Sequence, residues 1–221
     1  MKNLVYKVLE PKQIIANTPL LFMLHGYGSN EDDLFSFADE LNDRFLVISL
    51  RAPRSLHFGG YAWYDIDFTG ISSRFGNPEQ ALESLEMVFT IIVEMQAKYN
   101  ADKSRTVIMG FSQGAILCNA LSLRFPELIG SVVAMSGYVF NEIMPKQINS
   151  QLIDWIEYFV SHGIQDEVIP IEWAHVSVEW MKRMRLHVEY HEYNMGHGIN
   201  PQCFYDMMAW IASRYPILSV L

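Results

Sequence analysis

Residues 107–117 read VIMGFSQGAIL, and this stretch carries the strongest signal for the fold. A β-branched apolar run leads into it, a run of helix-forming residues leads out, and glycines stand two positions before and two positions after Ser112. A G-x-S-x-G pattern between a strand and a helix is typical of a sharp turn that holds the serine hydroxyl clear of the backbone. Residues two before and two after such a serine nearly touch, so only glycine fits at Gly110 and Gly114. The stretch therefore predicts a strand, a strained turn and a helix, with Ser112 as a candidate nucleophile.

Apolar runs of strand length recur on both sides of this turn. They lie at residues 3–9, 18–24, 44–50, 105–109, 129–135, 155–161 and 185–192. Most are almost continuously apolar, as expected for strands that are buried on both faces of a mainly parallel sheet. Helical patterns lie between them, at residues 29–41, 77–99, 113–124, 172–183 and 201–214. This alternation predicts an α/β fold with helices on both faces of the sheet.

Two of the helical patterns carry start signals. Ser29 or Asn30 is expected to cap the first, and Pro78 lies in the first turn of the second. The stretch at residues 136–151 has no regular pattern and is expected to lie over a site. Because no repeat, low-complexity tract or linker-like change of composition interrupts the chain, residues 1–221 are predicted to form one domain.

The charge balance excludes several classes of partner. With 16 Lys and Arg against 25 Asp and Glu, the formal net charge is −9, and the basic residues form no stripe. Nucleic acids and anionic membrane surfaces are therefore poor partners. The first residues lack the apolar core of a signal peptide, and no apolar run reaches membrane-spanning length. A lone pair of cysteines, Cys118 and Cys203, is weak evidence of secretion, so we expect a cytoplasmic protein that does not insert into membranes.

A serine nucleophile needs a base, and several histidines follow Ser112 in the chain. They are His162, His175, His187, His191 and His197. His197 stands between two glycines in NMGHGIN, directly after the last strand, where an exposed loop reaches across to the serine. The others fit less well, because they lie at the start of a turn, in a helical pattern or in a strand pattern. His197 is the predicted base.

The acid of such a triad follows the serine and precedes the histidine in chain order. The stretch at residues 161–170, SHGIQDEVIP, follows a strand and offers Asp166 and Glu167. Asp166 ends the turn, whereas Glu167 begins the next run, and Asp154 lies at the wrong end of the strand. A carboxylate in a rigid turn holds the imidazole in one tautomer and stabilises its positive form. Asp166 is therefore the predicted acid.

Two backbone N–H groups are needed to stabilise the negative charge that acyl transfer builds on a carbonyl oxygen. One should be the amide of Gln113, directly after the serine. The other normally belongs to a glycine-containing loop after an early strand, and LHGYGSN at residues 24–30 matches that description. We expect Tyr27 N–H to be the second donor, with His25 bracing the loop through hydrogen bonds.

With these pieces in place, the sequence resembles the phospholipase/carboxylesterase family of α/β hydrolases, the relatives of the acyl-protein thioesterases. Five blocks in the family's order carry the resemblance over nearly the whole chain: LHGYGSNEDDL, GGYAWYDIDF, GFSQGA, HGIQDEVIP and YNMGHGI. The eukaryotic thioesterase branch typically has leucine at the position of Tyr27 and aspartate at the position of Ser29, so the chain is more similar to the bacterial esterases. The resemblance implies an α/β-hydrolase fold without a large lid domain.

The resemblance also implies an activity and a site. The activity is that of a serine hydrolase of small-molecule carboxylic esters or thioesters, with lysophospholipid esters as a further class, and it needs no metal and no organic cofactor. The nucleophile maps onto Ser112, the acid onto Asp166 and the base onto His197. The oxyanion donors map onto the amides of Tyr27 and Gln113. Members of the family are often dimers, so a homodimer is one expected assembly.

The block at residues 58–68, FGGYAWYDIDF, lies near the site in the family. Its aromatic residues also fit a hydrophobic core, the usual place of such side chains. Glycines before them and acids among them favour a loop, and Trp63 is predicted to help wall the acyl pocket. Further candidates for that wall are Tyr138, Phe140 and Met144 in the irregular stretch at residues 136–151.

Two alternatives stay open. The same triad serves amidases, lactonases and peptidases, which differ from esterases in pocket shape. A G-x-S-x-G match alone also occurs by chance, so a binding protein that keeps the fold without turnover is the second alternative. The loss of a triad member would be its signature, and none is lost here.

Overall fold

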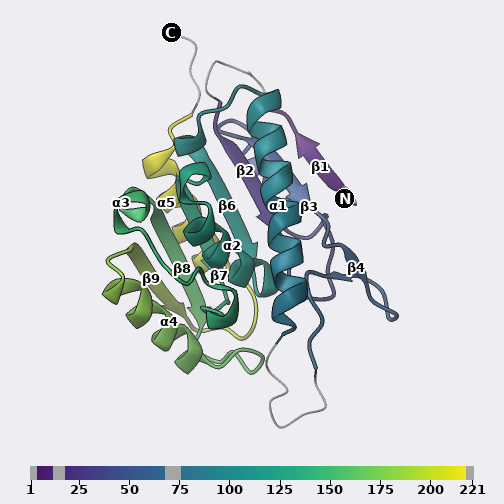
Figure 1. The fold of residues 1–221 in the computed structure, drawn as a ribbon, viewed down its shortest axis with the longest axis vertical. Coiled ribbons are helices and arrows are strands. Elements are labelled where there is room, and N and C mark those ends of the chain that lie inside the picture. Colours follow the sequence, from purple (N-terminus) through teal and green to yellow (C-terminus); the bar gives the residue numbers. More distant parts are fainter. Residues whose placement is uncertain (1–3, 12–17, 68–75, 218–221) are drawn as a thin grey trace.

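A seven-stranded sheet forms the centre of the protein (Figure 1). The structure is a computed structural model, and it describes residues 4–11, 18–67 and 76–217. From edge to edge, the strands are β1 (Tyr6–Leu9), β3 (Leu46–Leu50), β2 (Leu20–Leu24), β6 (Thr106–Phe111), β7 (Ser131–Met135), β8 (Glu157–Gly163) and β9 (His187–Tyr193). β1 is antiparallel to β3, and all other neighbours are parallel. The predicted strands and the mainly parallel sheet are confirmed, although residue 3 of the first prediction lies outside the described residues.

The central strands are apolar because both faces of the sheet are covered. Every residue of β2, β3 and β7 is buried. Leu21 of β2 is level with Val107 of β6, and Leu24 is level with Gly110. Parallel strands in this register end together, so the loops that follow them meet at one edge of the sheet, where α/β proteins bind ligands.

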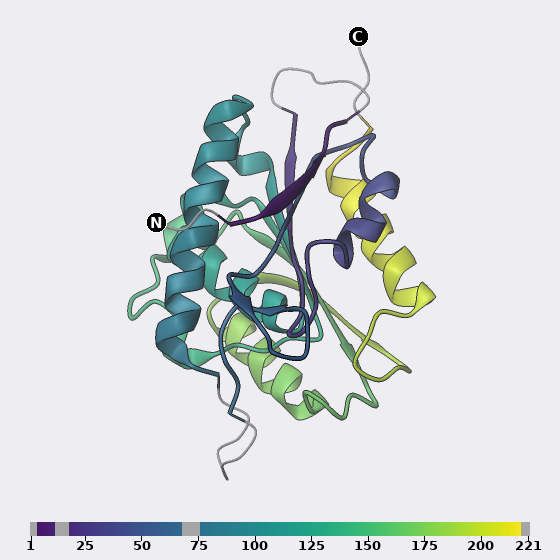
Figure 2. The same ribbon diagram turned by 90° about the vertical axis from the view of Figure 1, so that its right-hand side faces the viewer.

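Helices cover both faces of the sheet (Figure 2). One face carries α1 (Pro78–Lys98), α2 (Gln113–Arg124), α3 (Ser150–Ile153) and α4 (Ile171–Arg183). The other carries α5 (Pro201–Arg214) and the 3₁₀ helix η1 (Leu34–Glu40). The connecting segments contain the 3₁₀ helices η2 (Lys103–Arg105), η3 (Pro126–Leu128) and η4 (Asn141–Ile143), and a two-stranded sheet of β4 (Arg54–Ser55) and β5 (Tyr61–Ala62). The predicted α/β architecture is confirmed, whereas the sequence does not predict the small sheet.

The long helix α1 begins where its sequence predicts. The side-chain oxygen of Asn77 accepts the N–H of Gln80 at 3.1 Å, and Pro78 occupies the first turn. The buried face of the helix repeats every three or four residues, at Ala81, Leu85, Val88 and Ile92. This stripe packs against the sheet and holds the helix in place.

The helix predicted at residues 29–41 is wrong in its start and its type. The structure has a 3₁₀ helix that begins only after Asp33, and neither Ser29 nor Asn30 caps it. Ser29 instead pairs with Tyr61, whose N–H donates to Ser29 O at 2.8 Å. The Asn30 side chain accepts the N–H of Asp32 at 2.7 Å. An Asn side chain competes for local backbone groups in this way. Here this local turn and the pairing of Ser29 with a distant segment prevail over a helix.

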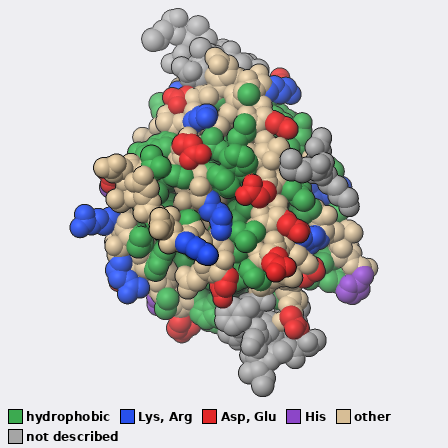
Figure 3. Space-filling model, in the orientation of Figure 1, with side chains coloured by type: hydrophobic (Ala, Val, Ile, Leu, Met, Phe, Trp, Pro, Cys, Tyr) green, Lys and Arg blue, Asp and Glu red, His purple; other side chains and the backbone are tan. Residues whose placement is uncertain are grey.

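The surface over α1 and α2 carries charges of both signs. Figure 3 shows basic and acidic side chains on this face, separated by apolar and neutral surface. Such a mixture is typical of a solvated face. In the described part of the chain, no helix is both long enough and apolar enough to span a bilayer.

The turn at Ser112 has the predicted strained geometry. Ser112 has φ 52° and ψ −117°, which L-residues rarely adopt, and it directly precedes α2. A Cβ at Gly110 would lie 2.4 Å from the carbonyl carbon of Gly114, which confirms the close approach. A Cβ at Gly114 would also lie 1.9 Å from Leu24 O of β2, a contact that the sequence does not reveal.

Gly114→Ala is expected to lower the free energy of unfolding by about 3 kcal/mol or more, because the new methyl group meets a backbone carbonyl of a central strand. Urea unfolding followed by circular dichroism would measure the loss. Gly198→Ala is the control, because a Cβ there meets no atom within 4 Å, and it should change stability by less than about 0.5 kcal/mol. Equal stability of the two variants would contradict this account.

Candidate active site

Three loops at the carboxyl edge of the sheet carry the predicted triad. Ser112 follows β6, Asp166 follows β8 and His197 follows β9. β8 is a neighbour of β9, and β7 separates it from β6. The order of strands therefore brings residues far apart in the sequence to one place.

The loops after β8 and β9 are fastened to each other. Ile164 N–H donates to Tyr193 O at 2.9 Å. A Cβ at Gly163 would lie 2.3 Å from Gly196 O, so the two loops approach as closely as they do only with glycine at this position. This contact sets the position of the histidine loop relative to the acid loop.

The three side chains form a continuous line of hydrogen bonds. His197 Nε2 lies 2.9 Å from Ser112 Oγ, and His197 Nδ1 lies 2.7 Å from Asp166 Oδ2. The Asp166 carboxylate is fully buried, whereas the imidazole is 17% exposed. The ring of Phe111 packs against the imidazole, with centroids 4.9 Å apart. Sequence reasoning and geometry thus select the same three residues, and their catalytic roles stay a prediction.

Backbone groups hold the buried carboxylate in position. Asp166 Oδ1 accepts the N–H of Val168 at 2.9 Å and the N–H of Ile169 at 2.8 Å. Hydrogen bonds of this kind offset the cost of removing a carboxylate from water. They also fix its rotation, so that Oδ2 is the oxygen directed at His197.

Gln113 and Tyr27, the predicted oxyanion donors, both line the cavity that contains Ser112. Gln113 is the first residue of α2, where the N-terminus of a helix favours negative charge. Its side chain accepts the N–H of Trp63 at 2.9 Å and donates to Tyr64 O at 2.6 Å. These bonds fasten the start of α2 to the segment after β5, and the donor role of the two backbone amides stays a prediction.

His25 braces the loop after β2, as expected. Ala52 N–H donates to His25 Nε2 at 3.0 Å, so Nδ1 carries the hydrogen and donates to Gly26 O at 2.7 Å. Burial lowers the pKa of His25, so the ring is neutral near neutral pH. Trp63 Nε1–H donates to His25 O at 2.9 Å and adds a further tie to this loop.

The remaining predicted alternatives to His197 do not line this cavity. His175 on α4 lies 2.7 Å from Glu192, and His187 and His191 on β9 lie beside Asp154 and Glu189 at 3.5 Å and 2.9 Å. His162 differs from the expectation that it begins a turn, because it lies inside β8 and is fully buried. The structure therefore leaves His197 as the histidine at Ser112.

His162 lies behind the acid. Its Nε2 is 2.8 Å from Ile169 O and 3.4 Å from Asp166 Oδ2. A carbonyl oxygen only accepts, so Nε2 carries the hydrogen. Burial lowers the pKa of His162, which keeps the ring neutral near neutral pH. The Nε2–H of His162 is therefore directed at Ile169 O, and the ring lies close behind the Asp166 carboxylate.

His162→Leu is expected to lower kcat about tenfold with little change in KM. Without the Nε2–H, Ile169 O loses its donor, and Ile169 is one of the two residues whose N–H groups hold the Asp166 carboxylate. The amide nitrogen of His162→Gln restores a donor and should recover most of the lost rate in steady-state kinetics. An equal loss in His162→Gln and His162→Leu, or a loss that appears mainly in KM, would contradict this positioning role.

The buried imidazoles of His25 and His162 also predict that the fold loses stability in mild acid. Below an ordinary pKa of about 6.5 each ring binds a proton in the unfolded chain but resists it in the native state, so unfolding takes up protons. The free energy of unfolding should fall by about 1 kcal/mol per ring from pH ~7 to pH ~5.5. Urea titrations at both pH values would measure the decline, which His162→Gln should reduce.

A cavity of about 530 Å³ opens at Ser112. Its walls are mainly apolar or aromatic and include Tyr64, Ile66, Ile116, Tyr138, Ile169 and Trp173. Glu167 adds a carboxylate to the rim. Among the described residues, no three His, Cys, Asp or Glu side chains converge to hold a metal ion. The cavity is of the size and character of a small-molecule site.

The structure corrects part of the predicted pocket. Tyr138 lines the cavity, but Trp63 does not: its side chain is fully buried, with its N–H bonded to His25 O. Met144 also packs in the core. Phe140 lines a neighbouring cavity instead. These side chains pack in the core because burying an indole or a thioether there removes a large apolar area from water.

Several wall residues were missed by sequence reasoning. Tyr64 is the direct neighbour of Trp63, and the predicted loop pointed to the right segment but to the wrong side chain. Val168 and Ile169 directly follow the acid loop, which is a signal that could have been used. Trp173 lies in the first turn of α4, and its place after β8 puts it at the same edge of the sheet.

Two relatives match this chain over most of its length. The acyl-protein thioesterase 1 of Yarrowia lipolytica is 27% identical over 213 residues, which span 89% of this chain and 92% of that protein. A probable carboxylesterase SOBER1-like protein of Arabidopsis thaliana is 26% identical over 223 residues, or 93% of this chain and 82% of that protein.

Solved structures show the same fold. Esterase PE8 superposes with a TM-score of 0.82 at 21% identity and covers 98% of this chain and 100% of its own. The Bacillus cereus carboxylesterase has a TM-score of 0.80 at 18% identity, with 96% and 95% covered. The model of the phospholipase/carboxylesterase family matches residues 6–214. The chain therefore belongs to the phospholipase/carboxylesterase family, has the α/β-hydrolase fold and is a hydrolase of the ester and thioester class.

Proposed function

We propose that the protein hydrolyses carboxylic esters or thioesters through a Ser112–His197–Asp166 triad and an acyl-enzyme intermediate. The observation that carries this proposal is the line of two hydrogen bonds, 2.9 Å and 2.7 Å long, from the serine hydroxyl to a buried carboxylate. An aliphatic hydroxyl is a poor nucleophile until a base removes its proton. The strained turn at Ser112 and the mainly apolar cavity beside it give further support.

The reaction has two halves. Ser112 Oγ attacks the carbonyl carbon while its proton moves to His197 Nε2, and the carbonyl oxygen becomes negative. The amides of Tyr27 and Gln113 donate to that oxygen. As the tetrahedral species collapses, the bond to the alcohol or thiol breaks and His197 gives the proton to the leaving atom. In the second half, water loses a proton to His197, attacks the acyl carbon and releases the carboxylic acid, and Ser112 regains its hydrogen.

Asp166 acts on this cycle through the imidazole. It accepts the Nδ1–H, which directs the lone pair of Nε2 at the serine hydroxyl. When the ring becomes positive, the buried carboxylate stabilises it. The backbone N–H groups of Val168 and Ile169 keep the carboxylate in place throughout the cycle.

A fluorophosphonate probe tests the assignment directly. Labelling should be stoichiometric, and mass spectrometry of the digested protein should place the label on the peptide that contains Ser112. A panel of esters, thioesters, lactones and anilides would then compare the proposed class with the amidase, lactonase and peptidase alternatives. Folded protein that takes up no label would revive a binding protein without turnover.

We further propose that the protein acts in the cytoplasm as a single domain. Cys118 and Cys203 are both unpaired and buried, which supports a reducing compartment. Cell fractionation with an antibody against the protein would test the compartment, and cooperative unfolding with one transition would test the single domain.

A further inference from the structure

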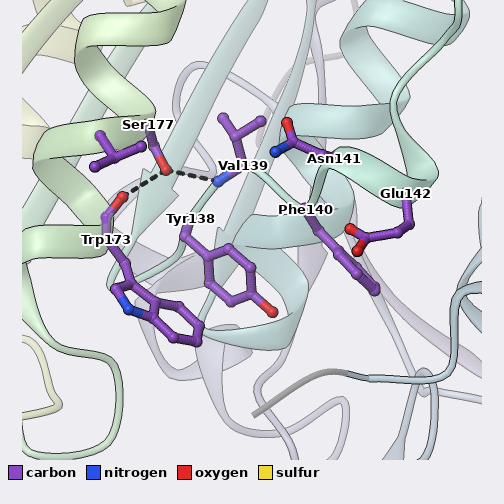
Figure 4. A pocket seen from close by; sticks show the side chains of 8 residues that line it. Tyr138, Val139, Phe140, Asn141, Glu142, Trp173 and Ser177 are labelled. Carbon is purple, nitrogen blue, oxygen red and sulfur yellow. Dashed lines mark hydrogen bonds between the residues drawn. The ribbon is translucent and has the colours of Figure 1, made fainter. Parts of the chain in front are cut away.

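A second cavity lies next to the candidate active site. It has a volume of about 370 Å³ and lies between α4 and the segment from β7 to η4 (Figure 4). Tyr138 and Trp173 line both this cavity and the one at Ser112. A substrate whose carbonyl carbon lies at Ser112 therefore has a direct neighbour site for another of its groups.

Three aromatic rings form the wall of this second cavity. Tyr138 meets Trp173 edge to face, with centroids 4.9 Å apart and planes at 79°. The centroid of Phe140 lies 6.2 Å from that of Tyr138. Figure 4 labels these three side chains together with Glu142, which lines the same cavity. Aromatic faces attract cations through the ring quadrupole.

The wall is held in position before any ligand binds. Ser177 on α4 donates to Trp173 O at 2.6 Å and accepts the N–H of Val139 at 2.8 Å (Figure 4). One hydroxyl thus joins the helix to the segment that carries Tyr138 and Phe140. A preformed wall costs little ordering on binding.

The charge of both cavities favours a cation. Glu142 lines the second cavity and Glu167 lines the first, and among the described residues no Lys or Arg lines either one. Glu142 makes no ion pair with another described residue, so its charge is available. The negative charge of Glu142 also acts on the aromatic wall. Burial and the nearby Glu142 together raise the pKa of the Tyr138 hydroxyl to about 12.

We infer that the second cavity binds the ammonium group of a cationic ester, and that it selects such substrates over neutral esters of the same shape. This inference rests on the proposed function, because the ester bond must lie at Ser112. Two or three ring faces and one carboxylate are the usual elements of a quaternary-ammonium site. An uncharged tail would fill the same space but would gain nothing from Glu142.

The test compares butyrylcholine with 3,3-dimethylbutyl butyrate, in which carbon replaces the charged nitrogen. Choline is also the better leaving group, so the two esters differ in intrinsic reactivity. The readout is therefore the ratio of kcat/KM for butyrylcholine to kcat/KM for the neutral ester. Comparing this ratio between each variant and the wild type cancels the intrinsic difference. Glu142→Gln should lower the ratio about fivefold, and Phe140→Leu about threefold. Glu94→Gln, an exposed change of the same charge on α1, should leave the ratio within about twofold.

The outcomes separate the two proposals. If the wild type hydrolyses p-nitrophenyl butyrate but the ratio is the same in Glu142→Gln and Phe140→Leu as in the wild type, the cation site is refuted and the hydrolase stands. Hydrolysis of p-nitrophenyl butyrate without hydrolysis of either paired ester also refutes it. If folded protein hydrolyses none of the three esters, it is the proposed function that fails.

Discussion

Ser112→Ala is expected to lower kcat/KM for p-nitrophenyl butyrate by about 10⁴-fold or more. The change removes the only atom that would form the covalent bond to the acyl group, while His197 and Asp166 keep their own hydrogen bond. The side chain is small and the strained backbone is set by its neighbours, so the fold should persist. Initial rates with purified protein, together with the fluorophosphonate label, would measure the loss.

Ser213→Ala provides the matched control for this result. Ser213 is exposed on α5, and its hydroxyl donates to Trp210 O within the same helix. The control should keep the wild-type rate and the wild-type label. If Ser112→Ala hydrolyses the ester as fast as the control does, no acyl group is carried by Ser112 and the proposed mechanism is wrong.

Asp166→Asn is expected to lower kcat by about 10⁴-fold with little change in KM. The amide keeps the shape of the side chain and can still accept from Val168 and Ile169 through its oxygen. Its NH₂ group, however, donates toward His197 Nδ1, so the hydrogen of the ring moves to Nε2. The imidazole then has no lone pair directed at Ser112.

Asp154→Asn is the control for the acid. Asp154 lies before β8, and its side chain is 80% exposed beside His187, so a structural effect is expected to be small. Steady-state kinetics and thermal unfolding of the two variants would separate chemistry from folding. A loss in Asp154→Asn that equals the loss in Asp166→Asn would contradict the choice of acid.

Much of the site could be predicted because its signals are local. A serine between two glycines, a strand before it and a helix after it lie within one short stretch, and the structure gives Ser112 the strained backbone that this pattern implies. Their loops and the chain order predict His197 and Asp166. In the structure His197 lies within hydrogen-bond distance of Ser112, and Asp166 within hydrogen-bond distance of His197. The variants above test their roles.

The sequence mispredicts residues whose environment depends on distant segments. Its pattern places Trp63 in the pocket wall, but Trp63 packs between the loop at His25 and the start of α2. It places His162 at the start of a turn, because nothing in that stretch shows that β8 continues through it beside β9. It predicts Ser29 as a helix cap, yet Ser29 pairs with Tyr61.

The order and type of most elements, the sharp turn at Ser112 and the chain order of the three candidate residues follow from local sequence patterns alone. Hydrophobic period, glycine spacing and proline position act over a few residues, so they can be read without knowing what packs against them. Contacts between distant segments set which side chains face the cavities, that His162 lies behind Asp166, and that Tyr138 and Trp173 line two cavities. Those facts depend on strand register and on contacts between segments far apart in the chain, where the same aromatic residue can be core or wall.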